Sequence, residues 1–486
     1  MAHVFRSVTR ICGIALYVLG LAMILSFVVS LICGEWQGDL PFLWTGLIVI
    51  LVGICSRFFC KSRPGKLHIG DGFLIVLILW IIMSAIGALP YIITGVISDP
   101  SSAFFESCSG FTTTGATTLH HINHLSHGIL FWRSMTGWLG GIAILLIAIT
   151  LMPALGLNGQ RLNTPDNYGP VLEQVSPRMI DSIRTIILIY TGLTLLETIL
   201  LTISGMTPFN GLIHSMSTVS TCGFSRYDNS IAHFEGCGIP LIMSAFMIIS
   251  GLNYHLFLRR PRNGIYAFMH NSEVRLYAVL LTSSFLLIAA YRSVARGQIT
   301  GRAVSDALFE SASFLSTTGF LSADYGRWPE LAQMLLLLLM LCGACTASAG
   351  GGLKVARISI LLKLVRHGVS ARLHTKFFET VRMNGQGMTA DAVSSVAVMP
   401  FLFLSALFSG AFLLTFGGVS LSTAFNASAA CLCNVGHAFG ALGLSGTFAG
   451  FDWLSKCLLS LLMIGGRLEL YAIVILLTPR YWMREH

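Results

Sequence analysis

The sequence predicts an all-α polytopic membrane protein in which four helix–loop–helix repeats, in a pseudo-four-fold arrangement, follow two extra N-terminal transmembrane helices. Three observations lead to this fold class. The chain of 486 residues is 54% hydrophobic and only 10% charged, whereas soluble domains carry roughly 25% charged residues. Its apolar residues come in blocks long enough to cross a bilayer, which takes about 20 residues per helix. A short motif of serine, threonine and glycine recurs four times between these blocks.

About ten apolar blocks are candidate membrane spans, two of them short or interrupted. They are Ile11–Leu31, Leu43–Cys55, Phe73–Ile93, Ile129–Leu151, Ile180–Ile203, Ile239–Leu258, Val274–Tyr291, Leu331–Leu341, Val393–Leu414 and Leu454–Leu477. The first block follows Arg6 and Arg10, as in a secretory signal, but it exceeds the usual apolar core of such a signal and lacks a small-residue cleavage site. We therefore expect a retained first helix.

The placement of the basic residues predicts the topology. The formal net charge is +9, which by itself is compatible with a nucleic-acid partner. When loops are assigned alternately from an inner N-terminus, however, most of the Lys and Arg residues fall on the inner side, as the positive-inside rule requires. We expect no nucleic-acid partner, and both termini in the cytoplasm of a bacterium, beneath its inner membrane. The basic stretch Lys354–Arg382 is long enough to contact anionic membrane lipids or a cytoplasmic protein.

The twelve cysteines do not form the pattern of a disulfide framework. Several lie inside apolar stretches, where reduced cysteine behaves as a small hydrophobic residue. Cys342 and Cys345 have the spacing of a redox or zinc motif, but no second pair or histidine accompanies them. A structural role is therefore the preferred interpretation.

The internal repeat is visible in four segments that align on Gly115, Gly223, Gly319 and Gly436. They read FFESCSGFTTTGA from Phe104, LIHSMSTVSTCGF from Leu212, LFESASFLSTTGF from Leu308 and FNASAACLCNVGH from Phe425. Eight positions before the glycine every copy has a serine, namely Ser107, Ser215, Ser311 and Ser428. The glycines are about 100 residues apart, which accommodates a helix out, a loop and a helix back.

The unit is therefore a helix–pore loop–helix repeat, and it divides the chain into five parts. We expect two N-terminal transmembrane helices in 1–66, repeat one in 67–160, repeat two in 161–262, repeat three in 263–370 and repeat four in 371–486. The helices of the first part are predicted at about 11–33 and 41–60.

Re-entrant loops of this composition predict a cation pathway. Irregular backbone survives at membrane depth only where it lines an aqueous cavity or is buried in protein. Four such loops around an axis would direct backbone carbonyls inward, and rings of carbonyls replace the hydration shell of potassium. Glycine permits the positive φ that this geometry needs. Short pore helices are expected at Ser102–Phe111, Pro208–Val219, Ala303–Leu315 and Ser422–Leu432, with their negative C-terminal ends toward the cation.

Two acidic residues, Glu106 and Glu310, occupy equivalent positions in repeats one and three. They could concentrate cations at the outer mouth of the pathway. Equally, they could accept hydrogen bonds from the backbone behind the loops, and the sequence leaves both possibilities open.

The four-fold series TTG, STCG, STTG and NVG resembles the filter loops of the Trk/Ktr superfamily of potassium transporters, and the two additional N-terminal helices make the chain most similar to its TrkH/TrkG branch. The resemblance covers nearly the whole chain. It implies uptake of potassium as the transported ion, with no cofactor bound by this chain. It also implies a selectivity filter formed by Thr113, Thr114, Gly115, Thr221, Cys222, Gly223, Thr317, Thr318, Gly319, Asn434, Val435 and Gly436.

A glycine-rich run, Gly343–Lys354, interrupts the second helix of repeat three. Three consecutive glycines hold a helix poorly, since each costs about 1 kcal/mol relative to alanine. The family has an intramembrane gating loop at this place, and the resemblance assigns the gate to Ala344, Cys345, Thr346, Ala347, Ser348, Ala349, Gly350, Gly351, Gly352 and Lys354. A passive kink is the alternative.

Arg467 lies in the apolar last helix, where a charge is costly and normally functional or paired. The family has a matching arginine that projects into the pore, so the resemblance makes Arg467 part of the gate. Glu469 could neutralise it, and a purely structural pair of these two residues is the alternative.

The chain departs from the family at two filter positions. Cys222 stands where the family often has glycine or threonine, and His437 follows Gly436 where the family usually has proline. Neither change removes a carbonyl. His437 could make transport sensitive to pH. The resemblance also implies a homodimer above a TrkA-like cytosolic, nucleotide-binding regulatory subunit.

Two other functional classes are weighed against this interpretation. No nucleophile elbow, Walker loop, dinucleotide fingerprint or HExxH motif is present, so an enzyme is not expected. A proton- or sodium-coupled secondary transporter of another cation stays open, with Glu197 as the main candidate for a coupling carboxylate. The cluster His120, His121, His124 and His127 could form an external metal site, although we expect no partner carboxylate nearby.

Overall fold

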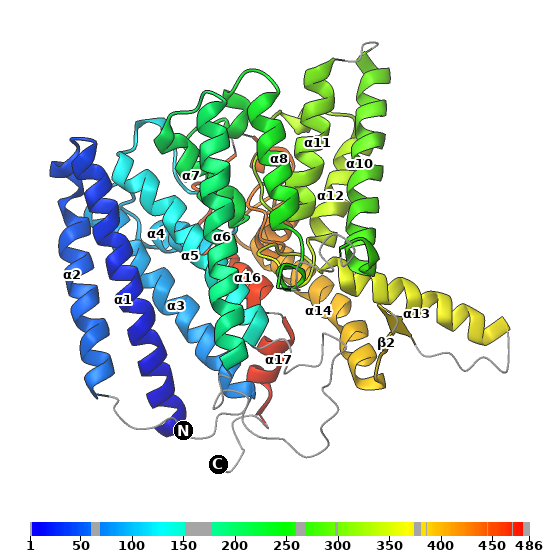
Figure 1. Ribbon diagram of the computed structural model, residues 1–486, viewed down its shortest axis with the longest axis horizontal. Coiled ribbons are helices and arrows are strands. Elements are labelled where there is room, and N and C mark those ends of the chain that lie inside the picture. Colours follow the sequence, from blue (N-terminus) through cyan, green and yellow to red (C-terminus); the bar gives the residue numbers. More distant parts are fainter. Residues whose placement is uncertain are drawn as a thin grey trace.

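The computed structural model describes residues 2–59, 69–150, 177–258, 268–296, 300–373, 381–384, 386–444, 446–468 and 470–479 (Figure 1). The regular secondary structure of these residues is almost entirely helical. One small hairpin pairs β1 (Arg382–Met383) with β2 (Gln386–Gly387) in antiparallel register, with Arg382 opposite Gly387. Within the same residues, seven helices are long and apolar enough to cross a membrane, so the chain is a multi-pass membrane protein.

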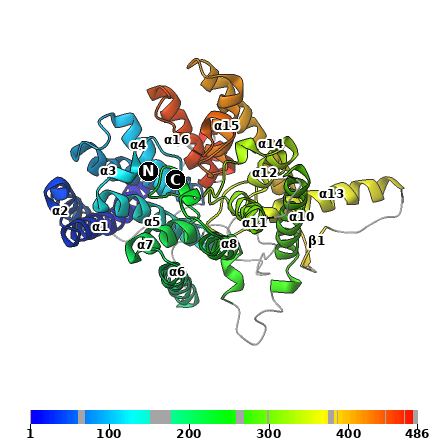
Figure 2. The ribbon, with the colours of Figure 1, turned by 90° about the horizontal axis from the view of Figure 1, so that it is seen from above.

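The N-terminal helices α1 (Ala2–Ile32) and α2 (Trp36–Phe59) lie side by side at one edge of the molecule (Figures 1 and 2). They approach closely at glycines: a Cβ on Gly20 would lie 2.7 Å from the Gly46 carbonyl oxygen. The helix predicted at about 41–60 is present as α2, which begins several residues earlier than predicted. Its first turn includes Asp39, whose carboxylate accepts a hydrogen bond from Ser30 Oγ (2.7 Å) and can therefore be buried.

Each of the next four units combines a long helix, a short helix and a further helix. The first contains α3 (Ile69–Ile93), α4 (Pro100–Phe111) and α5 (His127–Thr150), and the second α6 (Pro177–Ile203), α7 (Pro208–Val219) and α8 (Gly238–Ser250). The third contains α10 (Ser272–Arg296), α11 (Gly301–Ser316) and α12 (Glu330–Cys342), and the fourth α14 (Ala390–Thr415), α15 (Leu421–Leu432) and α16 (Trp453–Leu468), followed by α17 (Leu470–Leu477). Seen from above, α4, α7, α11 and α15 surround the middle of the molecule (Figure 2).

The four short helices begin in the same way, each with a capping side chain. Asp99 accepts hydrogen bonds from the Ser101 and Ser102 amides, and Thr207, Thr300 and Ser420 accept one from the amide three residues further on. Such a cap contributes about 1 kcal/mol. The side-chain hydrogen bonds from Ser101 and Ser102 also hold the pKa of the Asp99 carboxyl well below its usual range.

The predicted span Ile239–Leu258 ends earlier in the structure. The helix predicted at Ile239–Leu258 stops at Ser250, where the chain turns into a short 3-10 helix, Tyr254–Leu256. Gly251, at the end of this helix, is closely packed, since an added Cβ would lie 2.5 Å from the Tyr277 hydroxyl. The block Leu454–Leu477 corresponds to α16 and α17, and residue 469 between them lies outside the described residues.

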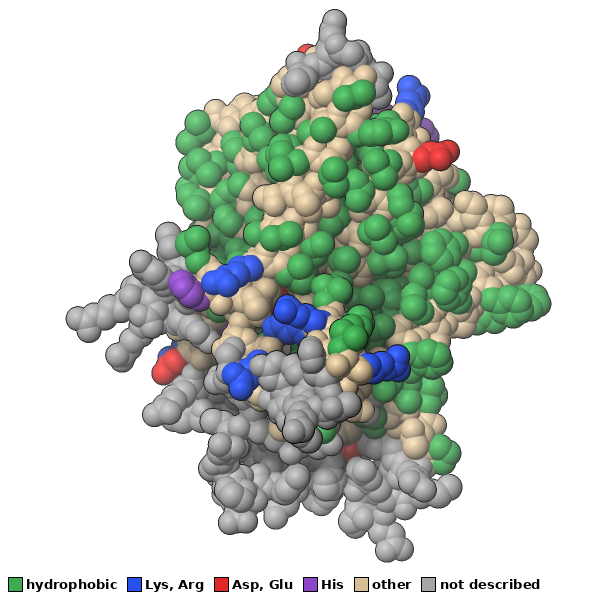
Figure 3. Space-filling view, turned by 90° about the vertical axis from the view of Figure 1, so that its right-hand side faces the viewer, with side chains coloured by type: hydrophobic (Ala, Val, Ile, Leu, Met, Phe, Trp, Pro, Cys, Tyr) green, Lys and Arg blue, Asp and Glu red, His purple; other side chains and the backbone are tan. Residues whose placement is uncertain are grey.

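Helix α13 (Val355–Leu373) projects from the body of the molecule, on the side where the termini lie (Figure 1). Figure 3 shows a broad band of apolar side chains with basic side chains below it. The predicted boundary at 370/371 falls inside α13. The other three predicted boundaries, at 66/67, 160/161 and 262/263, lie outside the described residues.

Candidate functional site

The backbone bends in the same way after each of the four short helices. Two residues before the motif glycine the chain is left-handed at a residue other than glycine, namely Thr113 (φ 49°), Thr221 (φ 55°), Thr317 (φ 58°) and Asn434 (φ 54°). The glycines that follow also have positive φ, at 78° for Gly115, 76° for Gly223, 84° for Gly319 and 81° for Gly436. Positive φ is a genuine outlier for a β-branched threonine. Strain of this kind persists where the surrounding structure requires it, typically at functional sites.

The four glycines close a ring of backbone contacts. A Cβ would lie 1.9 Å from Cys222 O if added to Gly115, 2.1 Å from Thr318 O if added to Gly223, 1.9 Å from Val435 O if added to Gly319, and 2.3 Å from Thr114 O if added to Gly436. The contacts thus run from repeat one to two, two to three, three to four and four to one. No side chain fits at any of the four positions without moving backbone.

The backbone amides of the residues just before the glycines form hydrogen bonds on the outer side of this ring. Each donates to a carbonyl of its own short helix, as in Thr114 to Ser109 (2.8 Å), Cys222 to Ser217 (2.9 Å), Thr318 to Ser313 (2.9 Å) and Val435 to Ala430 (2.9 Å). Their carbonyl oxygens lie against the glycine of the neighbouring loop. The C-terminal ends of four helices also meet here, which adds partial negative charge.

All twelve residues predicted for the filter are brought together in this ring, and the non-glycine members are fully buried. The Asn434 side chain, which differs from the threonine of the other repeats, has a bridging role. Its Nδ2 donates to Thr114 Oγ1 (2.9 Å) and to Met463 O (3.0 Å), and so ties repeat four to repeat one.

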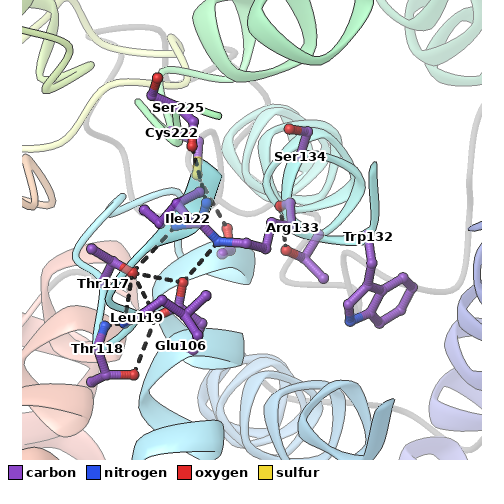
Figure 4. A network of polar contacts seen from close by, with 12 residues as sticks. Glu106, Thr117, Thr118, Leu119, Ile122, Trp132, Arg133, Ser134, Cys222 and Ser225 are labelled. Atoms are coloured by element: carbon purple, nitrogen blue, oxygen red, sulfur yellow. Dashed lines mark hydrogen bonds and ion pairs between the residues drawn. The ribbon is translucent and has the colours of Figure 1, made fainter. Parts of the chain in front are cut away.

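A buried ion pair supports the loop of repeat one from outside (Figure 4). The Glu106 carboxylate is fully buried and accepts hydrogen bonds from the Thr118 amide (2.8 Å), from Thr117 Oγ1 (3.0 Å) and from Arg133 Nε (2.9 Å). The Arg133 guanidinium also stacks over the Phe224 ring, with 4.2 Å to its centroid. Glu106 therefore fixes the segment after Gly115 and does not face the outer mouth.

Glu310 has the equivalent role in repeat three. Its Oε1 accepts hydrogen bonds from the amides of Ser322 (2.7 Å) and Ala323 (3.3 Å), and the side chain is fully buried. Of the two possibilities that the sequence left open for the paired glutamates, the structure favours hydrogen bonding to the backbone behind the loops.

Arg133→Met is expected to lower the stability of the folded protein by about 3–5 kcal/mol, because it leaves the buried Glu106 carboxylate without its cation. Arg327→Met is the matched control, since Arg327 pairs with Asp324 at 2.8 Å but its side chain is 87% exposed. Exposed pairs contribute little, so no shift is expected there. Thermal unfolding in detergent measures both, and equal midpoints for the two variants would contradict the supporting role of Arg133.

The glycine-rich segment between α12 and α13 is not helical and crosses beneath the ring. Its Gly351 amide donates to Thr317 Oγ1 (2.6 Å) in the loop of repeat three. A Cβ on the same glycine would lie 2.2 Å from Cys433 O, just before the loop of repeat four. Lys354, at the end of the segment, has φ 75° and donates through Nζ to the Gly350 carbonyl. The segment thus contacts two of the four loops directly.

Arg467 connects this segment to the loop of repeat one. Its Nε donates to Thr112 O (2.7 Å), its Nη1 to Ala349 O (2.6 Å), and its Nη2 to the carbonyl and hydroxyl oxygens of Thr113. Half-buried at this place, Arg467 puts a positive charge against the carbonyls at one side of the ring. Its predicted partner Glu469 lies outside the described residues.

Two cavities flank the ring. One, of about 230 Å³, is lined by residues that follow the glycines, including Thr117, Phe224 and His437. The other, of about 60 Å³, is lined by the glycine-rich segment together with Arg467 and Arg357. A path along the axis would therefore run from the first cavity through the ring to the segment and Arg467.

The histidines predicted as a cluster separate in space. His120 and His121 line the larger cavity. His127 Nδ1 lies 3.0 Å from Glu35 Oε1, which corrects the expectation that no carboxylate is nearby: Glu35 is distant in the sequence but adjacent in the fold. Within the described residues no group of three or more potential metal ligands is formed, by these histidines or by Cys342 and Cys345.

Glu197, the candidate coupling carboxylate, is fully buried in α6 beside Thr218 of α7. It lies behind the loop of repeat two and does not belong to the ring.

Two important residues were missed by the sequence reasoning. Arg133 could have been found, because a charge within an apolar helix normally has a partner or a function. Glu273, at the first turn of α10, is buried and contacts the glycine-rich segment. No local pattern in the sequence distinguishes it from an ordinary acidic residue at the start of a helix.

Comparison with known proteins identifies relatives along the whole chain. Residues 41–483 match the model of the TrkH family, described as cation transport proteins. The Trk system potassium uptake protein TrkH of Salmonella typhimurium is 31% identical, over 98% of this chain and 99% of the relative. The Trk system potassium uptake protein TrkG of Escherichia coli K12 is 30% identical, over 99% of each chain.

A solved structure shares the fold. The crystal structure of the potassium transporter TrkH from Vibrio parahaemolyticus superposes with a TM-score of 0.90 and 29% identity, covering 98% of this chain and 99% of the other. The family match and this superposition agree with the resemblance seen in the sequence, and the chain belongs to the TrkH family of cation transport proteins.

Proposed function

We propose that this protein carries potassium ions into a bacterial cell through a selectivity filter formed by the ring of four glycine loops. The observation that carries the proposal is the closed cycle of backbone contacts from Gly115 through Gly223, Gly319 and Gly436. The four residues that precede the glycines have their amides bonded to the short helices. Their carbonyl oxygens are therefore available to replace the hydration shell of a potassium ion. The named relatives are potassium uptake proteins and a potassium transporter.

The glycine-rich segment and Arg467 form the gate in this proposal. The segment lies across the axis beneath two loops, and Arg467 links it to a third. A cation bound to the filter carbonyls meets the Arg467 charge on its path, so the arrangement opposes conduction. Opening requires the segment and Arg467 to move aside.

The remaining proposals concern the surroundings of the protein. We place the protein in the bacterial inner membrane with both termini cytoplasmic, an orientation that the distribution of Lys and Arg supports. A homodimer is supported by α13, which projects from the body and exposes Leu362, Val365, Val369 and Leu373 at helical spacing. A TrkA-like cytosolic nucleotide-binding subunit fits the basic side of the molecule, as do anionic lipid headgroups.

Coupling to protons or sodium is a second candidate, and Glu197 is the observation that favours it. A buried carboxylate beside a pore helix could take up a proton or a sodium ion during transport. Channel-like conduction needs no such step.

Rubidium uptake into proteoliposomes that contain the purified protein tests the proposed function. We expect uptake that excess external potassium suppresses and excess sodium leaves nearly unchanged. Uptake that follows the membrane potential alone supports channel-like conduction. Uptake that depends on an imposed proton or sodium gradient supports coupling, and in that case Glu197→Gln should abolish the dependence. Rubidium uptake equal to that of protein-free vesicles, with the protein folded, would contradict the proposal.

A further inference from the structure

Glu273 is a buried acidic residue that contacts the glycine-rich segment at Thr346, whereas Arg467 contacts it at Ala349. The exposed fraction of Glu273 is 3%. Its Oε1 accepts a hydrogen bond from the Thr346 amide (2.5 Å) and its Oε2 one from Thr346 Oγ1 (2.9 Å). Both oxygens of the carboxylate are therefore directed at one residue of the segment. Hydrogen bonds to a charged group contribute more than neutral ones.

The surroundings of Glu273 fasten the neighbouring residues as well. Asn253 Nδ2 lies 3.3 Å from Thr346 Oγ1 and 3.4 Å from Glu273 Oε2. The Tyr254 amide donates to Ala347 O (3.0 Å), and the Cys345 amide donates to Gly251 O (3.0 Å). Residues 345–347 are thus bound to the end of repeat two and to the first turn of α10.

The segment consequently has two attachments of different character. Residues 349–351 are bound to Arg467 and to Thr317 in the loop of repeat three. Residues 345–347 are bound to the end of repeat two and, through Glu273, to the start of α10. Ser348, whose hydroxyl donates to Cys345 O (2.6 Å), lies between them. Release at Arg467 alone would leave the first half of the segment in place.

The start of α10 is in turn connected to the cytoplasmic hairpin of β1 and β2. The amide and the hydroxyl of Ser272 both donate to Asn384 Oδ1, at 2.8 and 2.9 Å. The hairpin is also bound to α13, because Lys363 Nζ donates to Arg382 O (2.9 Å). A displacement of the hairpin would therefore act on the residue directly before Glu273.

We propose that Glu273 is the positioning residue that retains the glycine-rich segment across the pathway, and that the hairpin sets the position of Glu273. This inference rests on the proposed function of the segment as a gate. A cytoplasmic partner that displaces the hairpin would weaken the bonds to Thr346 and shift the segment toward the open state. The differential contact required for such a population shift is the pair of Glu273–Thr346 hydrogen bonds.

Glu273→Ala tests the anchor in the rubidium uptake assay. Loss of two hydrogen bonds to a buried carboxylate should raise basal uptake about tenfold. Glu273→Gln keeps one acceptor oxygen and should restore much of the closed state. Glu330→Ala is the matched control: Glu330 is also an acidic residue in the first turn of a membrane helix, but it is exposed and lies away from the segment. Its uptake should equal that of the parent.

Thiol labelling supplies a readout that a loss of general stability would not produce. Cys345 is fully buried next to Thr346, and Cys108 is fully buried in α4, the short helix of repeat one. We expect Glu273→Ala to accelerate alkylation of Cys345, located by mass spectrometry, while Cys108 stays protected. Thr346→Val should produce a smaller effect in the same direction, and the double variant should fall short of the product of the single effects. A double variant whose effect equals the product of the two single effects would contradict the proposed role of Glu273. Equal alkylation of Cys345 and Cys108 would contradict it as well.

Asn384→Ala tests the hairpin by removing the acceptor for Ser272. It should raise basal uptake in the same direction as Glu273→Ala, and add nothing in the Glu273→Ala background. Unchanged uptake in Asn384→Ala would overturn the role of the hairpin. If Arg467→Ala raises uptake and Glu273→Ala does not, the proposed role of Glu273 is wrong, while the proposed gate is still supported. If neither the parent nor Arg467→Ala takes up rubidium, the proposed function itself fails.

Discussion

Gly319→Ser is expected to reduce discrimination between potassium and sodium by at least about tenfold while the protein stays folded. A Cβ at this position would lie 1.9 Å from the Val435 carbonyl oxygen, which is backbone and cannot rotate away. The collision must therefore displace a carbonyl of the ring, and the cavity that fits a dehydrated potassium ion changes its size. Gly223→Ser should behave alike, because its Cβ would meet Thr318 O at 2.1 Å. Competition of sodium with rubidium uptake measures the effect.

Gly95→Ser is the control for this experiment. Gly95 has φ 77°, nearly the same as the ring glycines, but no heavy atom lies within 4 Å of an added Cβ. Gly95→Ser therefore introduces the same backbone strain as Gly319→Ser, but without a collision. Unaltered selectivity in Gly319→Ser, or an equal loss in Gly95→Ser, would remove the ring from its proposed role as filter.

Arg467→Ala is expected to raise basal potassium flux about tenfold or more, since it removes both the charge on the pathway and the link between Ala349 and Thr112. Two unit charges 4 Å apart interact by about 4 kcal/mol at the effective dielectric constant of a protein surface. A barrier of that order opposes any cation that passes the guanidinium.

Arg467→Lys separates the charge from the link. Lysine keeps the positive charge but cannot reproduce the fork of donors that reaches Ala349 and Thr113 together. If the flux of Arg467→Lys is near that of the parent, the charge dominates. If it is near that of Arg467→Ala, the link dominates. Flux in Arg467→Ala at or below the parent would count against any gating role.

The repeated part of the fold could be predicted from the sequence because four copies supply an internal alignment. All four short helices begin and end within two residues of the predicted positions, and the glycine columns fall at equivalent places in the ring. The threonine and asparagine column before the glycines was recognised as well. Its left-handed conformation was not, because a β-branched residue normally avoids positive φ.

The supporting contacts could not be predicted, since they join residues that are far apart in the chain. Glu106 is 27 positions from Arg133, and Glu273 is 73 positions from Thr346. No periodicity connects such pairs. The same reason explains the correction at His127, whose partner Glu35 is 92 positions away.

A structure of the protein in rubidium, with the anomalous signal of that ion recorded, shows directly whether the ring binds the ion. We expect a peak on the axis of the ring, enclosed by the carbonyl oxygens that precede Gly115, Gly223, Gly319 and Gly436. Gly319→Ser should weaken or displace this peak. Well-occupied rubidium elsewhere, for example beside Glu197, together with an empty ring, would contradict a selectivity filter formed by the four glycine loops.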